Sequence, residues 1–179
     1  MYAEVAAGVR CSSAVHRYLQ SARDAIDGAV GRLSAEVISR KSDGRWSIAE
    51  ILEHLTLAYT GNAAALKKAL ESGELRARKP LLRQTLGRIL VVDIGYFPRV
   101  EAPSGTRPSG TIAPERALPA ARDALEELDR ALALVGQRFG ETLPVANHPY
   151  FAGLSVQQWR KFHWQHTRHH MKQVESRSR

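Results

Sequence analysis

The sequence has almost no cysteine, no long apolar run and no stretch dense in positive charge. Its single cysteine, Cys11, cannot form an intramolecular disulfide, which excludes a scaffold held by internal disulfides. The longest apolar cluster, 89–94, is broken by Asp93 and is far too short to cross a bilayer. The N-terminal stretch contains Glu4 and no apolar core, unlike a signal peptide. We therefore expect a cytoplasmic protein without a membrane partner, and an inert Cys11 thiol.

The remaining composition is that of a folded protein. The 179 residues, 44% hydrophobic and 25% charged, suit one domain with a sizeable core. We predict a single domain over 1–179, with its core at about 13–175. The net charge of +8 raises the question of nucleic acid, but Lys and Arg are scattered and form no stripe with aromatics. This pattern indicates a basic solvated surface, so no nucleic-acid partner is expected.

Apolar residues at helical spacing predict four long helices. We expect them over about 13–37, 47–73, 119–139 and from 155 onward. The second and fourth each begin with a capping box, formed by Ser47 with Glu50 and by Ser155 with Gln158. These two starting points fix which residues share a face on each helix.

A long connection over about 73–119 separates the second helix from the third and holds six of the eight prolines. We expect a short helix over 81–92 inside it and a loop in the rest. A connection this long is typical of a lid, a binding loop or a crossover. A second loop, over 140–153, precedes the fourth helix. Together these features predict an all-α four-helix bundle of the up-down-down-up type, with a proline-rich crossover between helices two and three.

Four of the seven histidines lie within eight residues, at His163, His166, His169 and His170. Because residues four apart share a helix face, His166 and His170 point together toward the apolar face, and the other two fall to either side. Two imidazoles at this spacing can chelate one metal ion. The best candidate for a third ligand is His54, at the flank of the second helix's apolar stripe.

Other interpretations of these residues stay open on spacing alone. A lone histidine on a helix face is typically a hydrogen-bonded core or boundary residue, and His169 suits a helix C-terminus through the helix dipole. Trp159 and Tyr59 fit core packing better than a pocket lining. Glu50 fits a cap better than a general base. Gln173 is a candidate to hold a ligand histidine in one tautomer.

Two stretches, RWSIAEILEHL and WRKFHWQHTRHHMKQV, resemble signature segments of the DinB/YfiT-like superfamily. The segment NHPYFAGLS before the fourth helix resembles its DinB_2 or DUF1569-like branch. The resemblance spans about 13–175 and implies a four-helix bundle with one divalent ion on three histidines. Carried onto the matching positions, the ligands are His54, His166 and His170. The connection over 73–119 lies outside the family's core pattern.

The resemblance also implies a metal-dependent enzyme that transfers a low-molecular-weight thiol to an electrophile, with hydrolysis of a small substrate as a close relative. An open metal position can hold a thiolate or activate water. Imidazoles do not discriminate among zinc, nickel and iron, and the sequence assigns no catalytic residue. The alternative is a non-catalytic metal-binding stress-response or ligand-binding module. A homodimer is expected from the family and from Leu57 and Trp164, which are predicted on outer helix faces.

Overall fold

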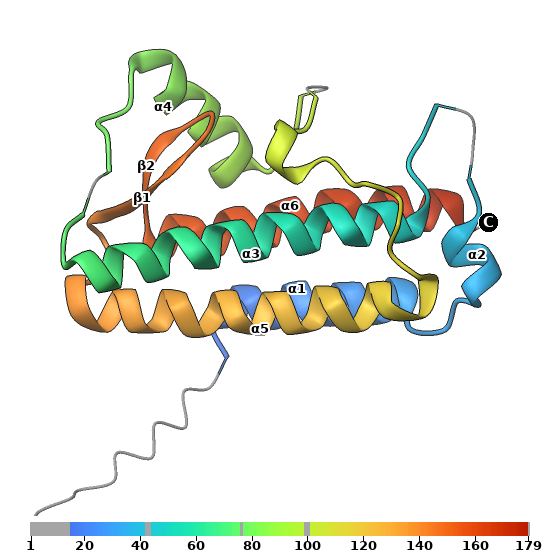
Figure 1. The fold of residues 1–179 in the computed structure, drawn as a ribbon. Helices are drawn as coiled ribbons and strands as arrows, with labels where there is room; N and C mark the ends of the chain where they lie inside the picture. The colour runs from blue at the N-terminus through green and yellow to red at the C-terminus, as the bar shows by residue number, and fades with distance from the viewer. Residues whose placement is uncertain (1–14, 42–43, 76, 99–100, 179) are drawn as a thin grey trace, which may run out of the picture.

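The structure, a computed structural model, describes residues 15–41, 44–75, 77–98 and 101–178 (Figure 1). Cys11 and the first two residues of the expected first helix lie outside these ranges. Within them the chain is mostly helical, with six α-helices and one two-stranded sheet. The four long helices are α1 (Arg17–Val30), α3 (Ile48–Ser72), α5 (Pro114–Phe139) and α6 (Val156–Arg177). No helix in the described part of the chain is long and apolar enough to span a membrane.

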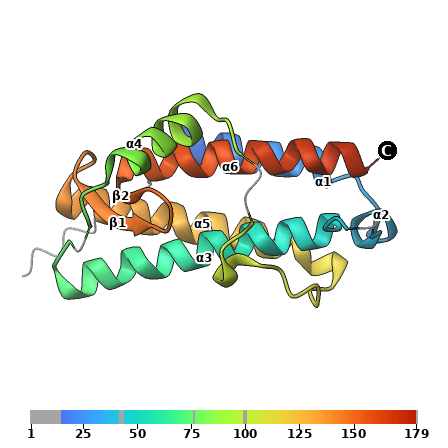
Figure 2. The same ribbon diagram turned by 90° about the horizontal axis from the view of Figure 1, so that it is seen from above.

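The long helices run side by side in Figures 1 and 2. The most extensive contacts join α3 to α5 and α1 to α6. Apolar side chains from all four helices meet in one core, because each helix carries its apolar residues on one side. Fully buried members include Leu19, Ile26, Leu52, Leu128, Leu132 and Trp159. The histidine-bearing helices α3 and α6 also contact each other directly.

Both predicted capping boxes are present. The Ser47 hydroxyl accepts from the Glu50 main-chain N–H at 3.2 Å, and the Glu50 carboxylate accepts from the Ser47 N–H at 2.8 Å. Ser155 and Gln158 repeat this arrangement at the start of α6. Helix α3 ends before Gly73, which adopts the left-handed conformation (φ 69°) that favours glycine. Local sequence therefore fixes the register of both histidine-bearing helices.

The first helix is shorter than predicted. Helix α1 ends at Val30, and a separate short helix, α2 (Ala35–Ser39), follows after a turn. The Ser34 hydroxyl accepts from the Val37 N–H at 3.3 Å, so Ser34 caps a new helix instead of continuing the old one. Helix α5 begins earlier than predicted, at Pro114, because proline suits the first helical position.

The long connection contains α4 (Leu82–Arg88), the π-helical η1 (Ile89–Ile94) and the 3-10 turn η2 (Ser104–Thr106). The short helix expected over 81–92 is therefore present in position, and a π-helix extends it to residue 94.

The second predicted loop is a β-hairpin. Strands β1 (Pro144–His148) and β2 (Ala152–Ser155) pair antiparallel, with His148 opposite Ala152. All four β2 residues are buried, so this short strand lacks the alternating polar pattern by which a half-buried strand is recognised. The expectation of purely helical structure is wrong at this hairpin.

Candidate metal centre

Three histidines from two helices converge on one point. Helix α3 supplies His54, and α6 supplies His166 and His170 one turn apart. The Nε2 atom of His166 lies 3.1 Å from Nε2 of His54 and 3.1 Å from Nε2 of His170. One ring nitrogen from each histidine lies within 4.8 Å of the others. The structure thus brings together the three residues that the sequence selected.

This spacing fits one divalent ion. Nitrogens that bind a tetrahedral ion at 2.0–2.1 Å lie about 3.3 Å apart, close to the two 3.1 Å separations observed. Hydrogen bonding alone does not satisfy the arrangement. The single Nε2 atom of His166 faces two other ring nitrogens and can share one proton with only one of them. A cation between the rings would satisfy all three nitrogens together.

Two of the rings are held in the tautomer that ligation needs. Nδ1 of His54 lies 2.7 Å from the Thr106 main-chain oxygen, and Nδ1 of His170 lies 3.1 Å from the Gln173 side-chain oxygen. Because these oxygens only accept, each Nδ1 must carry the proton, which leaves Nε2 with its lone pair. His169 orients the Gln173 amide, because the Gln173 side-chain nitrogen lies 3.0 Å from Nε2 of His169.

Burial keeps the three imidazoles neutral. His54 and His170 are 4% and 6% exposed, and Nδ1 of His166 is shielded from solvent with no hydrogen-bond partner in the part of the chain that the structure describes. Desolvation lowers the pKa of His54, lowers the pKa of His170 to about 3 and holds the pKa of His166 well below its usual range. Neutral imidazole is the form that binds metals.

Aromatic rings enclose the cluster. Phe97 and Phe162 both stack on the His166 ring, with ring centroids 5.7 Å and 5.4 Å away. The indole of Trp46 lies 5.1 Å from the His54 ring. The sequence did not predict Phe97 or Thr106 as neighbours of the site. Both lie in the connection between α3 and α5, whose path is set by tertiary contacts and not by a local motif.

The other two histidines of α6 lie outside the cluster, as their helical positions predict. His163 is fully buried, and its Nε2 atom lies 3.2 Å from the side-chain amide nitrogen of Asn62. His169 stacks on Phe97 at 4.8 Å and contacts Gln173. Tyr59 and Trp159 are buried core residues. The expectation that these two aromatics pack in the core is confirmed.

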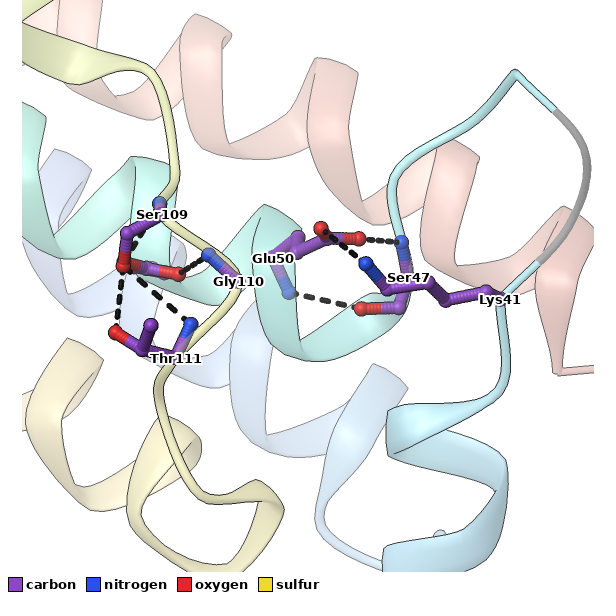
Figure 3. A network of polar contacts seen from close by, with 7 residues as sticks. Lys41, Ser47, Glu50, Ser109, Gly110 and Thr111 are labelled. Carbon is purple, nitrogen blue, oxygen red and sulfur yellow. Dashed lines mark hydrogen bonds and ion pairs between the residues drawn. The ribbon is translucent and has the colours of Figure 1, made fainter.

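One carboxylate on α3 holds the connection between α3 and α5, whose residues Ser109 and Gly110 are labelled in Figure 3. Glu53, the residue before His54, accepts from the Ser109 N–H at 2.9 Å, the Ser109 hydroxyl at 2.5 Å and the Gly110 N–H at 3.0 Å. Glu50 belongs to the capping box and accepts from the Lys41 ammonium at 3.1 Å. Glu50 is therefore a cap, as predicted. Glu53 fixes the segment that brings Thr106 to His54.

A cavity of about 300 Å³ lies elsewhere, among α1, α5 and α6. It is lined by His16, Asp129, Ala133, Gly136, Gln137, Glu141 and Arg160. Within this lining, the Arg160 guanidinium pairs with the Glu141 carboxylate at 2.5 Å. None of the three converging histidines borders this cavity, so it is not the space beside the candidate metal centre.

Comparison with known proteins identifies one family. Residues 16–177 match a family described as protein of unknown function (DUF1569). The match covers α1 to α6 and includes all three converging histidines. No curated protein and no solved structure matches the chain.

Proposed function

The chain belongs to the DUF1569 family, whose function is unknown, and from its own geometry we propose that it is a metal-dependent enzyme of the DinB/YfiT-like type. In this proposal the four long helices form the bundle of that superfamily. His54, His166 and His170 hold one divalent ion, zinc, nickel or iron. The observation that carries the proposal is the convergence of three Nε2 atoms in a buried site.

The proposed reaction transfers a low-molecular-weight thiol to a small electrophile in the cytoplasm, with hydrolysis as a close relative. A divalent ion with an open position supplies a thiolate or hydroxide nucleophile at neutral pH. The chain's own residues orient and shield this position. Thr106 and Gln173 hold the Nδ1 protons of two ligands, and Phe97 and Phe162 pack against the His166 ring.

A second candidate is a non-catalytic metal-binding module. It is favoured by the two phenylalanines that stack on the His166 ring, since a crowded site also suits a structural ion with a closed shell. The two candidates differ in whether an outside ligand can reach the ion.

Metal analysis tests the site itself. Protein purified without a histidine tag should contain close to one divalent ion per chain by elemental analysis. His170→Ala should lose most of this metal. His169→Ala is the matched control and should keep most of it, because the His169 ring packs edge-on against His170 but its nitrogen faces Gln173 and is not one of the three converging nitrogens. Equal loss in both variants, or no binding by the wild type at pH 7.5 with excess zinc or nickel, contradicts the assignment.

A cobalt-loaded sample separates the enzyme from the module. If a position is open, an added thiol should bind the ion and produce a thiolate-to-cobalt charge-transfer band in the near-ultraviolet spectrum. If the spectrum is unchanged by thiol and by azide, the shell is closed and the module is supported instead.

A further inference from the structure

One stretch of the surface collects most of the exposed apolar side chains. Seven of the ten large hydrophobic residues that are exposed among the described ones lie between positions 81 and 96, around α4 and η1. They are Leu81, Leu82, Leu86, Ile89, Leu90, Ile94 and Tyr96. We call these seven side chains the apolar ridge. Leu82 is 77% exposed and Ile94 is 64% exposed, so the surrounding residues leave the ridge uncovered.

The ridge is the outer face of a helical element. Leu82, Leu86 and Leu90 follow one another every four residues and therefore point the same way. The inner face is held by the core, in which Val91 and Val92 are buried. Figure 1 shows α4 at the outer edge of the molecule, on the side away from α1 and α5. An exposed apolar patch of this kind is typical of a surface that binds a partner or a membrane.

Positive charge accompanies the ridge. Between positions 75 and 92 the sequence has five cationic residues and no acidic one. Three of them, Arg78, Lys79 and Arg83, are exposed and form no ion pair among the residues that the structure describes. Arg83 follows Leu82 and lies about 100° further round the helix, at the side of the ridge. The ridge is therefore an apolar strip with a cationic margin.

This combination is typical of a helix that lies in the plane of a membrane surface. We propose that the apolar ridge binds the surface of a bilayer that contains anionic lipids. The leucines enter the boundary between headgroups and acyl chains, and Arg78, Lys79 and Arg83 meet the headgroup phosphates. Tyr96, at the end of the ridge, suits the same depth, because a tyrosine ring is apolar and its hydroxyl is polar.

Charge favours a lipid surface over a second copy of this chain. A two-fold interface places the same patch on both sides, so the cations beside one ridge would meet the same cations beside the other. Asp93, the first acidic residue after them, already pairs with Arg88 at 3.4 Å and with Lys161 at 2.9 Å. An anionic bilayer supplies the missing negative charge, which raises affinity about fivefold for each cation near the surface.

The proposed contact is a surface association and not a membrane span. The apolar cluster over 89–94 is far too short to cross a bilayer, but a helix that lies in the surface needs only one apolar face. The expectation of no membrane partner depends on the length of apolar runs, and so it bears on spanning helices alone. The association goes beyond the proposed function and does not rest on it, because no ridge residue is one of the three converging histidines.

Vesicle flotation tests the association. The wild type should float with vesicles of phosphatidylcholine and phosphatidylglycerol, and much less with phosphatidylcholine alone. Raising the salt concentration to about 1 M should weaken the binding, because the Debye length then falls to about 3 Å. The double variant Lys79→Gln/Arg83→Gln should bind the anionic vesicles about 25-fold more weakly, fivefold for each cation. Lys68→Gln/Arg116→Gln is the matched control, since both cations are exposed on α3 and α5, and it should bind far more tightly than the ridge variant.

A second pair of variants tests the apolar part. Leu82→Ser/Leu86→Ser should lose at least about tenfold in affinity for the anionic vesicles, with unchanged helical circular dichroism. Leu134→Ser/Leu143→Ser is its control, since these leucines are 53% and 54% exposed outside the ridge, and it should bind as the wild type does.

A labelled variant keeps the proposal testable if the serine variant misfolds. In a Cys11→Ser background, a polarity-sensitive fluorophore on Leu86→Cys should shift to the blue with the anionic vesicles, and the same fluorophore on Leu134→Cys should not. Absence of binding to these vesicles overturns the proposal. So does equal binding by the ridge and control variants, because the net charge of +8 alone then explains it. A disulfide-linked dimer of Leu86→Cys that ignores vesicles also overturns it, since a second copy then covers the ridge.

Discussion

The main-chain carbonyl of Thr106 accepts a hydrogen bond from the Nδ1–H of His54 at 2.7 Å. The two residues are 52 positions apart, and the contact joins the connection between α3 and α5 to a candidate metal ligand. The same connection is anchored one residue before His54, where Glu53 accepts from three donors on Ser109 and Gly110. The connection that holds the His54 tautomer is therefore anchored by Glu53, a carboxylate that is not one of the three converging side chains.

Replacing Glu53 should weaken metal binding without removing a ligand. Glu53→Ala frees the Ser109 and Gly110 donors, so the Thr106 carbonyl is held less firmly against His54. Loss of a partner that orients a ligand typically costs 10–100-fold in metal affinity, and we expect a loss in this range. The measurement is a zinc titration in competition with a chromophoric chelator.

The control for this substitution is Glu127→Ala. Glu127 pairs with Lys67 on the surface and has no contact with the connection over the site, so its loss should leave zinc affinity unchanged. If Glu53→Ala binds zinc as tightly as this control does, the connection does not position His54.

Replacing Gly95, where η1 ends and the chain turns, should destabilise the fold. It adopts a left-handed conformation (φ 80°), and a Cβ there would lie 2.6 Å from both the Arg168 guanidinium and the Gln165 amide oxygen. Gly95→Ala should therefore lower the free energy of unfolding by about 1–2 kcal/mol, through backbone strain and displaced side chains. Urea denaturation of the metal-free protein measures this.

Gly61→Ala provides a comparison of opposite sign. Gly61 lies within α3, is exposed, and has no atom within 4 Å of the added Cβ. Alanine there should raise the free energy of unfolding by about 0.5–1 kcal/mol, because it favours the helix. Equal effects at the two glycines would show that conformation and crowding at Gly95 do not matter.

The ligand histidines could be predicted from the sequence, whereas the segment that covers two of their neighbours could not. The starts of α3 and α6 follow from Ser47 and Ser155 and the residues three positions later, so the faces carrying His54, His166 and His170 were predictable from local rules. The path of residues 97–110 follows from long-range contacts such as Glu53 with Ser109, which have no local signal. For that reason neither Phe97 nor Thr106 could be assigned to the site in advance.

The β-hairpin and the break after α1 were missed for different reasons. Strand β2 is buried throughout and too short for a clear period, so its sequence resembles a loop. At the break, the apolar pattern continues into α2, but Ser34 offers its hydroxyl to the Val37 N–H and starts a new helix. At the hairpin, hydrogen bonds between β1 and β2 decide the structure, and at the break the Ser34 cap does. In neither place does the pattern of apolar residues decide it.

Acid should destabilise the fold through two buried histidines outside the metal centre. Burial lowers the pKa of His148 and the pKa of His163 to about 3 each, because the charged imidazolium is disfavoured away from water. The unfolded chain titrates near 6.5, so between pH 6.5 and about 3 it binds protons that the folded chain does not. The free energy of unfolding is therefore greatest above pH 6.5. As the pH is lowered from 6.5 toward 3, it decreases by about 1.4 kcal/mol per pH unit for each histidine.

Two variants at the hairpin separate this titration from simple loss of packing. His148→Asn keeps an acceptor for the Tyr150 N–H but removes the titrating ring, which stacks on Phe151 at 4.3 Å. In urea denaturation with a chelator present, it should be less stable at pH 7.5, and its free energy of unfolding should fall less steeply from pH 6.0 to 4.5, by about 1.4 kcal/mol per unit. Phe151→Leu disturbs the same stack and leaves both histidines in place, so it should lower stability equally at every pH and keep the wild-type slope. If His148→Asn also keeps that slope, His148 is not the group that takes up the proton on unfolding.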